Sequence, residues 1–267
     1  MNVLARQPSD ANADLSLNRT GPEVSIVAPV FDEEGAVETL AREIAAAFAG
    51  WRHEILFVND ASRDGTGARL AALAQELPTL RILTHGRNAG QSRAIRTGVL
   101  AARAPIVVML DGDGQNDPAD GPRLVEALRA GQPRLGLVGG ERRSRQDSSS
   151  KRWASRLANG VRRRLLNDQA VDTGCGLKAF RRDAFLALPY FDHLHRYLPA
   201  LMLREGFGVA FLPVGHRARG SGRSKYSNLG RLGVAIFDLA GVIWLRARAR
   251  DPGQVSEAPR DMPGEGP

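Results

Sequence analysis

Residues 105–118 are PIVVMLDGDGQNDP, and this stretch decides which fold to expect. The apolar run 105–110 is typical of a strand buried on both faces of a sheet. Asp111 and Asp113 follow it directly, with one glycine between them. Two like charges this close are unfavourable unless a cation neutralises them. Their oxygens suit Mg²⁺ or Mn²⁺, which also accept substrate phosphates as ligands, and Gln115 adds one more carbonyl oxygen.

Other apolar segments of this kind alternate with helix patterns. Strands are expected at 23–30, 53–59, 80–84, 105–110 and 135–138, and helices at 35–48, 66–76, 91–103 and 118–130. Later residues predict helices over 151–166, 196–205 and 229–245, an extended stretch over 172–180, a strand over 207–214 and a loop over 215–227. The alternation predicts an α/β fold whose parallel sheet is covered by helices on both faces. Ligands bind such sheets beyond the carboxyl ends of the strands.

Polar residues also follow the first two strands. Residues 32–34 are Asp-Glu-Glu, where a dinucleotide-binding fold would have G-x-G-x-x-G, and the chain has no Walker A motif. Both observations argue against NAD, FAD and P-loop nucleotides. The three acids are equally consistent with the start of a helix. Asp60 and Ser62 follow the second strand, where they suit a turn, or a carboxylate that accepts the N–H of a nucleobase.

The composition is that of an ordinary globular protein, with 267 residues, 43% of them hydrophobic, and a mean hydropathy of −0.26. The single cysteine, Cys175, excludes a disulfide scaffold and a cysteine-rich metal site. Residues 1–20 hold no apolar run, so no secretory signal is expected and the default location is cytoplasmic. The net charge of +8 is concentrated in residues 141–170 and 216–250. Such a basic field attracts nucleic acid, an anionic bilayer or a phosphorylated substrate.

Four segments resemble glycosyltransferase family 2: VAPVFDEEGAV (27–37), FVNDASRDGT (57–66), RNAGQSRAIRTG (87–98) and VVMLDGDGQNDP (107–118). The resemblance covers about residues 22–231 and is closest to the dolichol-phosphate mannosyltransferase-like branch, which makes polyprenyl-phosphate sugars. It implies a GT-A fold, that is, a Rossmann-like, mostly parallel sheet with helices on both faces. The expected domains are a disordered leader (1–21), a GT-A domain (22–227), an apolar C-terminal helix (228–250) and a disordered tail (251–267).

The resemblance implies roles for residues at the strand ends. The metal ligands would be Asp111, Asp113 and Gln115. The donor-binding residues would be Pro29, Phe31, Glu33, Asp60, Asn88 and Asp111, with Asp60 on the nucleobase. The chain departs from the family pattern at Asn59 and Ala61, where the family usually has Asp and Gly, and at Phe31, which lacks the hydroxyl of the usual Tyr.

The second half extends the resemblance through DTGCGLKAF (172–180), HRY (195–197), PVGHR (213–217) and GRSKY (222–226), the last being specific to the branch. In the family the Arg-Ser-Lys loop lies over the donor diphosphate and the acceptor phosphate. This implies that Arg223 and Lys225 act in catalysis with Asp113, and that Ser224 contacts the acceptor phosphate. The arginines that resemble those on the lipid phosphate are Arg142, Arg143, Arg152 and Arg156.

The acceptor determines whether a general base is needed. A sugar hydroxyl must lose a proton, whereas a phosphate monoester is largely dianionic at pH 7 and needs only cationic groups to place it. The candidate bases are Asp172, Asp192, His195 and His216, and no sequence motif around any of them marks it as a general base. Asp172 suits a turn equally well, and His195 suits the surface of a helix. A phosphate acceptor is therefore favoured.

A lipid acceptor requires contact with a membrane, and the apolar helix expected over 229–245 is the segment that could make it. Its run 232–245 spans only ~21 Å as a helix, less than the ~30 Å of a bilayer core, and Asp238 interrupts it. It is expected to lie on a membrane interface or to pack on the domain. Arg246, Arg248 and Arg250 would then meet anionic headgroups.

The sequence therefore predicts an inverting glycosyltransferase that uses Mg²⁺ or Mn²⁺. It would move a sugar from a GDP- or UDP-sugar to polyprenyl phosphate at the cytoplasmic face of the inner membrane. The expected partners are an anionic membrane surface and an integral membrane glycosyltransferase or flippase. The alternatives are a family 2 enzyme with a saccharide or lipid hydroxyl acceptor, and a nucleic-acid-binding protein. The last would leave Asp111 and Asp113 unexplained, and interleaved aromatic residues are lacking.

Overall fold

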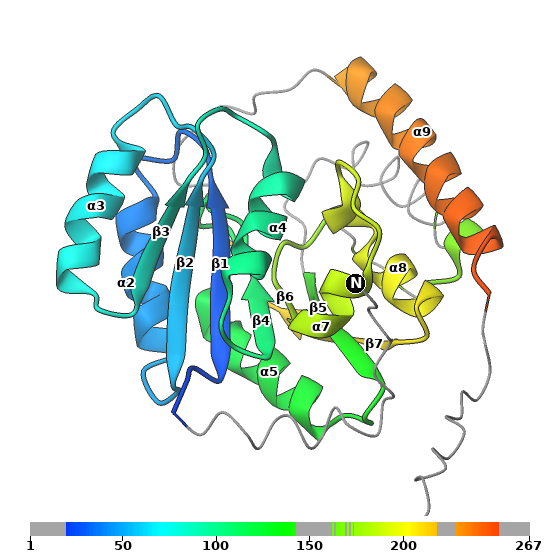
Figure 1. The fold of residues 1–267 in the computed structure, drawn as a ribbon, viewed down its shortest axis with the longest axis horizontal. Coiled ribbons are helices and arrows are strands. Elements are labelled where there is room, and N and C mark those ends of the chain that lie inside the picture. Colours follow the sequence, from blue (N-terminus) through cyan, green and yellow to red (C-terminus); the bar gives the residue numbers. More distant parts are fainter. Residues whose placement is uncertain are drawn as a thin grey trace, which may run out of the picture.

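The computed structural model describes residues 20–142, 162, 164–168, 170, 172, 174–217 and 228–250, with side chains from 233 onward in the last range. Its centre is a seven-stranded sheet in the order β3-β2-β1-β4-β6-β5-β7 (Figure 1). The strands are β1 (Val24–Val30), β2 (His53–Asn59), β3 (Leu80–Thr84), β4 (Ile106–Met109), β5 (Leu135–Arg142), β6 (Lys178–Arg181) and β7 (Gly208–Val214). β1 to β4 are parallel to one another, β6 is antiparallel to β4 and β5, and β7 is parallel to β5. The mostly parallel α/β fold is confirmed.

Helices cover both faces of the sheet, as expected. One face carries α2 (Val37–Ala47), α3 (Thr66–Glu76) and α5 (Gly121–Ala130). The other face carries α4 (Gln91–Ala101), α7 (Arg182–Ala187) and α8 (Leu198–Arg204). Two short 3₁₀ turns, η1 (Pro118–Asp120) and η2 (Leu194–Arg196), precede α5 and α8, and α9 (Asn228–Ala247) lies along the outer edge of the molecule (Figure 1).

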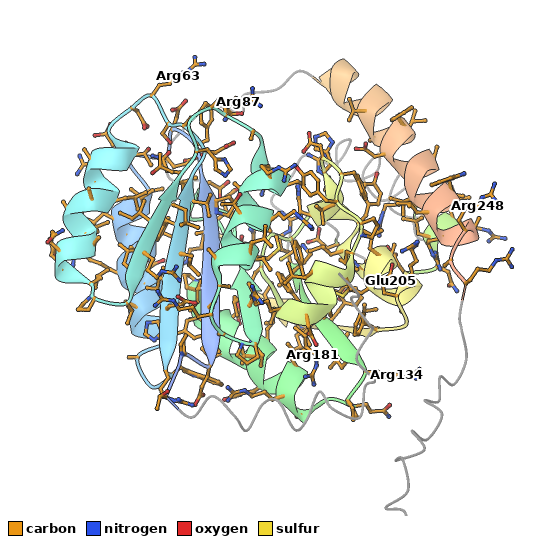
Figure 2. All side chains as sticks on the ribbon, in the orientation of Figure 1. Arg63, Arg87, Arg134, Arg181, Glu205 and Arg248 are labelled. Atoms are coloured by element: carbon orange, nitrogen blue, oxygen red, sulfur yellow. The ribbon has the colours of Figure 1, made fainter. Side chains whose placement is uncertain are left out.

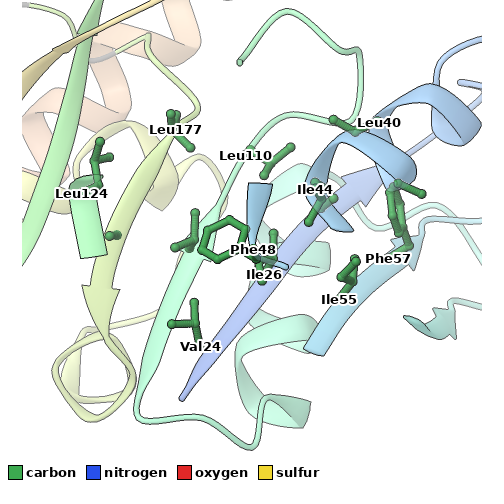
Figure 3. Close-up of a cluster of buried hydrophobic side chains, with 14 of the residues drawn as sticks. Val24, Ile26, Leu40, Ile44, Phe48, Ile55, Phe57, Leu110, Leu124 and Leu177 are labelled. Carbon is green, nitrogen blue, oxygen red and sulfur yellow. The ribbon is translucent and has the colours of Figure 1, made fainter. Parts of the chain in front are cut away.

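The core divides into two clusters because successive side chains of a strand point to opposite faces. All seven residues of β1 are buried, as a central parallel strand requires. Val24 and Ile26 pack with α2 and α5 around Phe48 (Figure 3), whereas Val27 packs on the α4 face. The apolar stripe of α2, which includes Leu40 and Ile44, closes the first cluster.

The structure differs from the sequence prediction beyond β4. β6 lies at the end of the extended stretch predicted over 172–180, but its antiparallel pairing, which makes the sheet mixed, was not predicted, and neither was α7. The helix predicted over 196–205 is divided into η2 and α8, with Pro199 in the first turn of α8, where its missing N–H is harmless. The strand predicted over 135–138 continues to Arg142. The leader, the tail, most of the helix predicted over 151–166 and most of the loop 215–227 lie outside the described residues.

Close packing of α4 on the sheet predicts that Gly98→Ala is destabilising. A Cβ at Gly98 would overlap Val27 and press on Val58. We expect the free energy of unfolding to fall by ~1–3 kcal/mol through overpacking, although alanine favours helices. Urea denaturation measures the change. Gly50→Ala, which enters open space, is the control and should change stability by less than ~0.5 kcal/mol. Wild-type stability in Gly98→Ala would contradict this packing.

Candidate active site

The carboxyl ends of β1, β2 and β4 meet at one edge of the sheet, because these strands are parallel and in direct register. Asp111 and Asp113 follow β4 at this edge, as the sequence predicted. Figure 2 shows Arg63 and Arg87 standing at the same edge, while Arg134 and Arg181 stand at the opposite one. The candidate site therefore lies where open α/β sheets bind their ligands.

The loop that carries the two acids, residues 111–117 and called the acid loop below, is held by three hydrogen bonds. Gln91, the first residue of α4, donates to Asp111 Oδ1 from Nε2 at 2.7 Å. Asn116 accepts from the Asp111 backbone N–H at 3.1 Å, and Asp113 Oδ1 accepts from the Gln115 N–H at 3.1 Å. These bonds aim the carboxylates before any ligand arrives.

The loop also lies close to the backbone on both sides. A Cβ at Gly112 would lie 2.5 Å from the carbonyl oxygen of Pro29, at the end of β1. A Cβ at Gly176 would overlap the Asp111 carboxylate and would come within 2.7 Å of Asn116 Oδ1. Only glycine, which has no Cβ, lets the segment before β6 approach Asp111 this closely.

The electrostatics of the acid pair are unfavourable without a counter-charge. Burial, and then the charge of Asp113, raise the pKa of the Asp111 carboxyl, while Lys178 opposes the rise. Lys178 is itself buried, which lowers its pKa, and its ammonium donates to the carbonyl oxygen of Cys175. A divalent cation would offset the burial and mutual repulsion of these two carboxylates, and the amide oxygen of Gln115, two residues after Asp113, suits the same ion. The described side chains hold no cluster of three His, Cys, Asp or Glu in metal-binding range.

Residues 215–217 anchor the far side of the acid loop. The Arg217 backbone N–H donates to the Gln115 carbonyl at 2.9 Å, and its guanidinium lies 3.0 Å from Asp117. His216 forms an antiparallel bridge with Asn116. Burial and the nearby Arg142 lower the pKa of His216, and its buried Nδ1 has no hydrogen-bond partner among the described residues. Residues 216 and 217, which precede GRSKY (222–226) in the sequence, are therefore bonded to the acid loop.

Asp60 organises the loop that follows β3. Its Oδ1 accepts from the Ala89 N–H at 2.9 Å and lies 2.6 Å from His85 Nδ1, and its Oδ2 accepts from the Gly90 N–H at 2.8 Å. Asn88 donates to the Asp60 carbonyl oxygen at 3.2 Å. Asp60 and Asn88 thus come together as expected, and contact of Asp60 with a nucleobase stays a prediction. A surface hollow of about 720 Å³ lies beside His85, and its lining includes Arg87 and Arg93.

Residues 32–34, which follow β1, are hydrogen-bonded to residues 63–66, which follow β2. The Arg63 N–H donates to Asp32 Oδ1 at 2.7 Å, and the Glu33 N–H donates to Thr66 Oγ1 at 2.9 Å. Glu34 Oε2 accepts from the Gly65 N–H at 3.1 Å. Ala36, the N-cap residue of α2, makes no side-chain capping bond, and the three acids lie just before this helix, so both interpretations of them stay open. Their bonds fix residues 32–34 on the loop that follows β2, while Pro29 at the end of β1 lies against Gly112. The donor contacts of Pro29, Phe31 and Glu33 stay a prediction.

Two candidate bases are already engaged. Asp172 accepts from Arg142 Nε at 2.5 Å and from Nη2 at 2.7 Å, and this bond raises the pKa of the guanidinium. His195 Nδ1 lies 2.7 Å from Ser92 Oγ, and burial holds the pKa of His195 well below its usual value. The alternative of a surface helix residue does not describe His195, because it lies in η2 and its ring contacts Ser92 of α4. Asp192 is exposed.

The remaining predicted residues lie outside the described part of the chain; they are Arg143, Arg152, Arg156, Arg223, Ser224 and Lys225. Sequence analysis missed His85, Gln91 and Lys178. His85 directly follows β3, so the strand-end rule that selected Asp60 would have found it. Gln91 stands inside a segment already noted for its resemblance. Lys178 also stands inside a segment noted for its resemblance, DTGCGLKAF (172–180), but its burial near Asp111 depends on the antiparallel pairing of β6, which was not predicted.

Comparison with known proteins agrees with this geometry. The model of the glycosyl transferase family 2 matches residues 25–188. The chain belongs to glycosyltransferase family 2. It is 34% identical over 235 residues to a dodecaprenyl-phosphate galacturonate synthase of Rhizobium johnstonii, covering 85% of this chain and 69% of that protein. It is 37% identical over 221 residues to an undecaprenyl-phosphate 4-deoxy-4-formamido-L-arabinose transferase of Pseudomonas aeruginosa, covering 81% of this chain and 63% of that protein.

Solved structures support the fold of this glycosyltransferase. A glucosyl-3-phosphoglycerate synthase of Mycobacterium tuberculosis, in complex with Mn²⁺, UDP and glucosyl-3-phosphoglycerate, has a TM-score of 0.65 at 19% identity. The likeness covers 95% of this chain and 88% of that one. It supports the GT-A architecture and says nothing of the substrate. The chain spans about two thirds of the length of the two curated relatives.

The close approach of Gly176 to Asp111 predicts a loss of metal affinity in Gly176→Ala. The added methyl would push the Asp111 carboxylate out of its place, and displacing a ligand in this way costs about 10–100-fold in affinity. Titration of Mn²⁺ by electron paramagnetic resonance measures the change. Gly208→Ala, whose Cβ would make ordinary contacts at 3.5 Å, is the control. Unchanged Mn²⁺ affinity in Gly176→Ala would show that Asp111 is not a ligand.

Proposed function

We propose that this family 2 glycosyltransferase moves a sugar from a UDP- or GDP-sugar to polyprenyl phosphate, with inversion at the anomeric carbon. A phosphate oxygen of the acceptor forms the new bond to that carbon, and the bond to the nucleoside diphosphate breaks. The product would be a lipid-phosphate sugar that donates to cell-envelope glycans or lipids. Support comes from relatives named for dodecaprenyl and undecaprenyl phosphate, at 34% and 37% identity.

The donor half of the proposal rests on the acid loop. Asp111, Asp113 and Gln115 would hold Mg²⁺ or Mn²⁺, ions that accompany UDP in structures of the mycobacterial synthase. A divalent cation there would neutralise the charge that develops on the leaving diphosphate. Gln91 and Asn116 fix the acid loop, and Asp60 fixes the loop 85–90 beside the predicted nucleobase site. The residues of this chain would therefore act on the donor by holding its metal ion and its nucleotide in position.

One observation carries the choice of a phosphate acceptor, namely the two-bond pairing of Asp172 with Arg142 at the end of β5. A hydroxyl acceptor needs a carboxylate or imidazole that can take its proton. Asp172 accepts two N–H groups from Arg142, and the Nδ1 of His195 is engaged with Ser92. His216, whose Nδ1 has no hydrogen-bond partner among the described residues, is the base that a hydroxyl acceptor would use. A phosphate acceptor needs a positioned guanidinium instead, and Asp172 holds Arg142 in place for that role.

The proposal extends to location and partners. With a lipid acceptor the enzyme would work at a membrane surface, and we propose the cytoplasmic face of the inner membrane, beside anionic lipids. An integral membrane glycosyltransferase or flippase would take the product onward. In the part of the chain that the structure describes, no helix has both the length and the apolar character to cross a bilayer.

The test is transfer of labelled sugar into an organic-extractable product. The assay contains polyprenyl phosphate, Mg²⁺ or Mn²⁺, and a panel of UDP- and GDP-sugars. We expect label in the organic phase from one donor, lost with EDTA and reduced at least ~100-fold in Asp113→Ala. Asp183→Asn, an exposed acid in the first turn of α7, is the matched control and should keep wild-type activity.

Two outcomes would contradict the proposal. Label that reaches a saccharide or a lipid hydroxyl, and never a lipid phosphate, would favour a hydroxyl acceptor. Salt-dependent retention on DNA that Asp113→Ala leaves unchanged, with no transfer from any donor, would favour nucleic-acid binding.

A further inference from the structure

Helix α9 presents an apolar face to the outside of the molecule. The most exposed of its large side chains are Phe237 at 80%, Ile236 at 61% and Trp244 at 60%. The exposed residues from 233 to 244 are Gly233, Val234, Ile236, Phe237, Ala240, Gly241, Ile243 and Trp244. This part of the exposed face carries no charged residue. A solvent-facing helix normally has its polar face outward, so this pattern is reversed.

The inner face of α9 fixes the helix to the body. Asp238, the charged residue within the apolar run, turns inward, and its carboxylate lies 2.9 Å from His193 Nδ1. The Tyr197 hydroxyl donates to the Ala235 carbonyl at 3.2 Å, and Arg204 Nε donates to the Leu245 carbonyl at 3.0 Å. Val242 is fully buried. The outward apolar face therefore belongs to a docked helix, and a contiguous patch of this kind marks an interaction site.

The end of α9 adds positive charge to the apolar face. Arg246 lies in its last turn, and Arg248 and Arg250 follow at the exposed surface. The Arg248 guanidinium lies 6.0 Å from the centre of the Trp244 ring, so the basic end adjoins the apolar face. Figure 2 shows Arg248 at the end of α9. Aromatic and aliphatic side chains beside arginines fit the boundary between acyl chains and anionic headgroups.

We propose that the outer face of α9 docks in the plane of an anionic phospholipid bilayer. Phe237, Trp244, Ile236 and Ile243 would enter the acyl boundary, and the three arginines would meet the headgroups. The inference rests on the proposed function for one point, that the acceptor lipid lies in that bilayer. The arginines favour an anionic membrane over a second copy of the chain, because the exposed face of α9 from 233 to 244 carries no acidic residue with which a second copy could pair them.

Co-sedimentation with vesicles tests the docking. Wild-type protein should bind vesicles of phosphatidylglycerol mixed with phosphatidylcholine at least ~10-fold more tightly than phosphatidylcholine alone. The double variant Phe237→Ser/Trp244→Ser should lose at least ~10-fold in binding to the anionic vesicles. Leu100→Ser removes an apolar side chain that is 53% exposed on α4 and is the matched control. The triple variant Arg246→Gln/Arg248→Gln/Arg250→Gln should lose the preference for the anionic lipid.

A second assay separates this inference from the proposed function. Transfer to a short, water-soluble prenyl phosphate should be unchanged in Phe237→Ser/Trp244→Ser, while transfer to polyprenyl phosphate in vesicles falls at least ~10-fold. Wild-type vesicle binding in the double variant overturns the docking and leaves the proposed function standing. A wild-type dimer that the double variant dissociates, without vesicle binding, also overturns it in favour of a second copy. Failure of transfer to both acceptors in wild-type protein, with vesicle binding intact, overturns the proposed function alone.

Discussion

Two carboxylates with a single glycine between them, at the end of a buried strand, are the constraint on which the rest of the site depends. Asp111 and Asp113 repel each other, and burial makes the charge on Asp111 still less favourable. The fold nevertheless holds them there through Gln91 from α4 and Asn116 from the same loop. A protein tolerates such an arrangement where a cation and its ligand need it.

The second half of the chain is arranged around the same point. β6 runs against the direction of its neighbours, and this brings Gly176 against Asp111. The charge of Lys178, the first residue of β6, lowers the pKa of the Asp111 carboxyl. Residues 215–217 then return to bond the acid loop from the other side. The antiparallel strand thus brings the segment before it against the loop that follows β4. Asp172, in the same segment, pairs with Arg142 at the end of β5.

The sequence predicted the parts of the fold that depend on local pattern. Continuous apolar strands identified β1 to β4, and the strand-end rule found Asp60, Asp111 and Asp113. It predicted an extended stretch over 172–180 but not the antiparallel pairing of β6, because a four-residue strand beside glycines has no periodicity that would reveal its partners. It could not find Lys178 or the pairing of Asp172 with Arg142, since these partners are distant in sequence and meet only through β5 and β6. Ala61 adopts a left-handed backbone, φ 60°, that the sequence did not signal.

Thermal unfolding of Asp113→Asn with and without Mn²⁺ tests most directly whether the acid pair is a cation site. Without a cation, the variant should melt above wild type, because the repulsion with Asp111 is removed while the amide oxygen can still accept from the Gln115 N–H. Mn²⁺ should raise the melting temperature of wild type, because at 100 times its Kd it adds about 2.7 kcal/mol to the free energy of unfolding. The melting temperature of the variant should not change. An equal Mn²⁺ shift in both proteins, or a variant that melts below wild type without cation, would contradict the account.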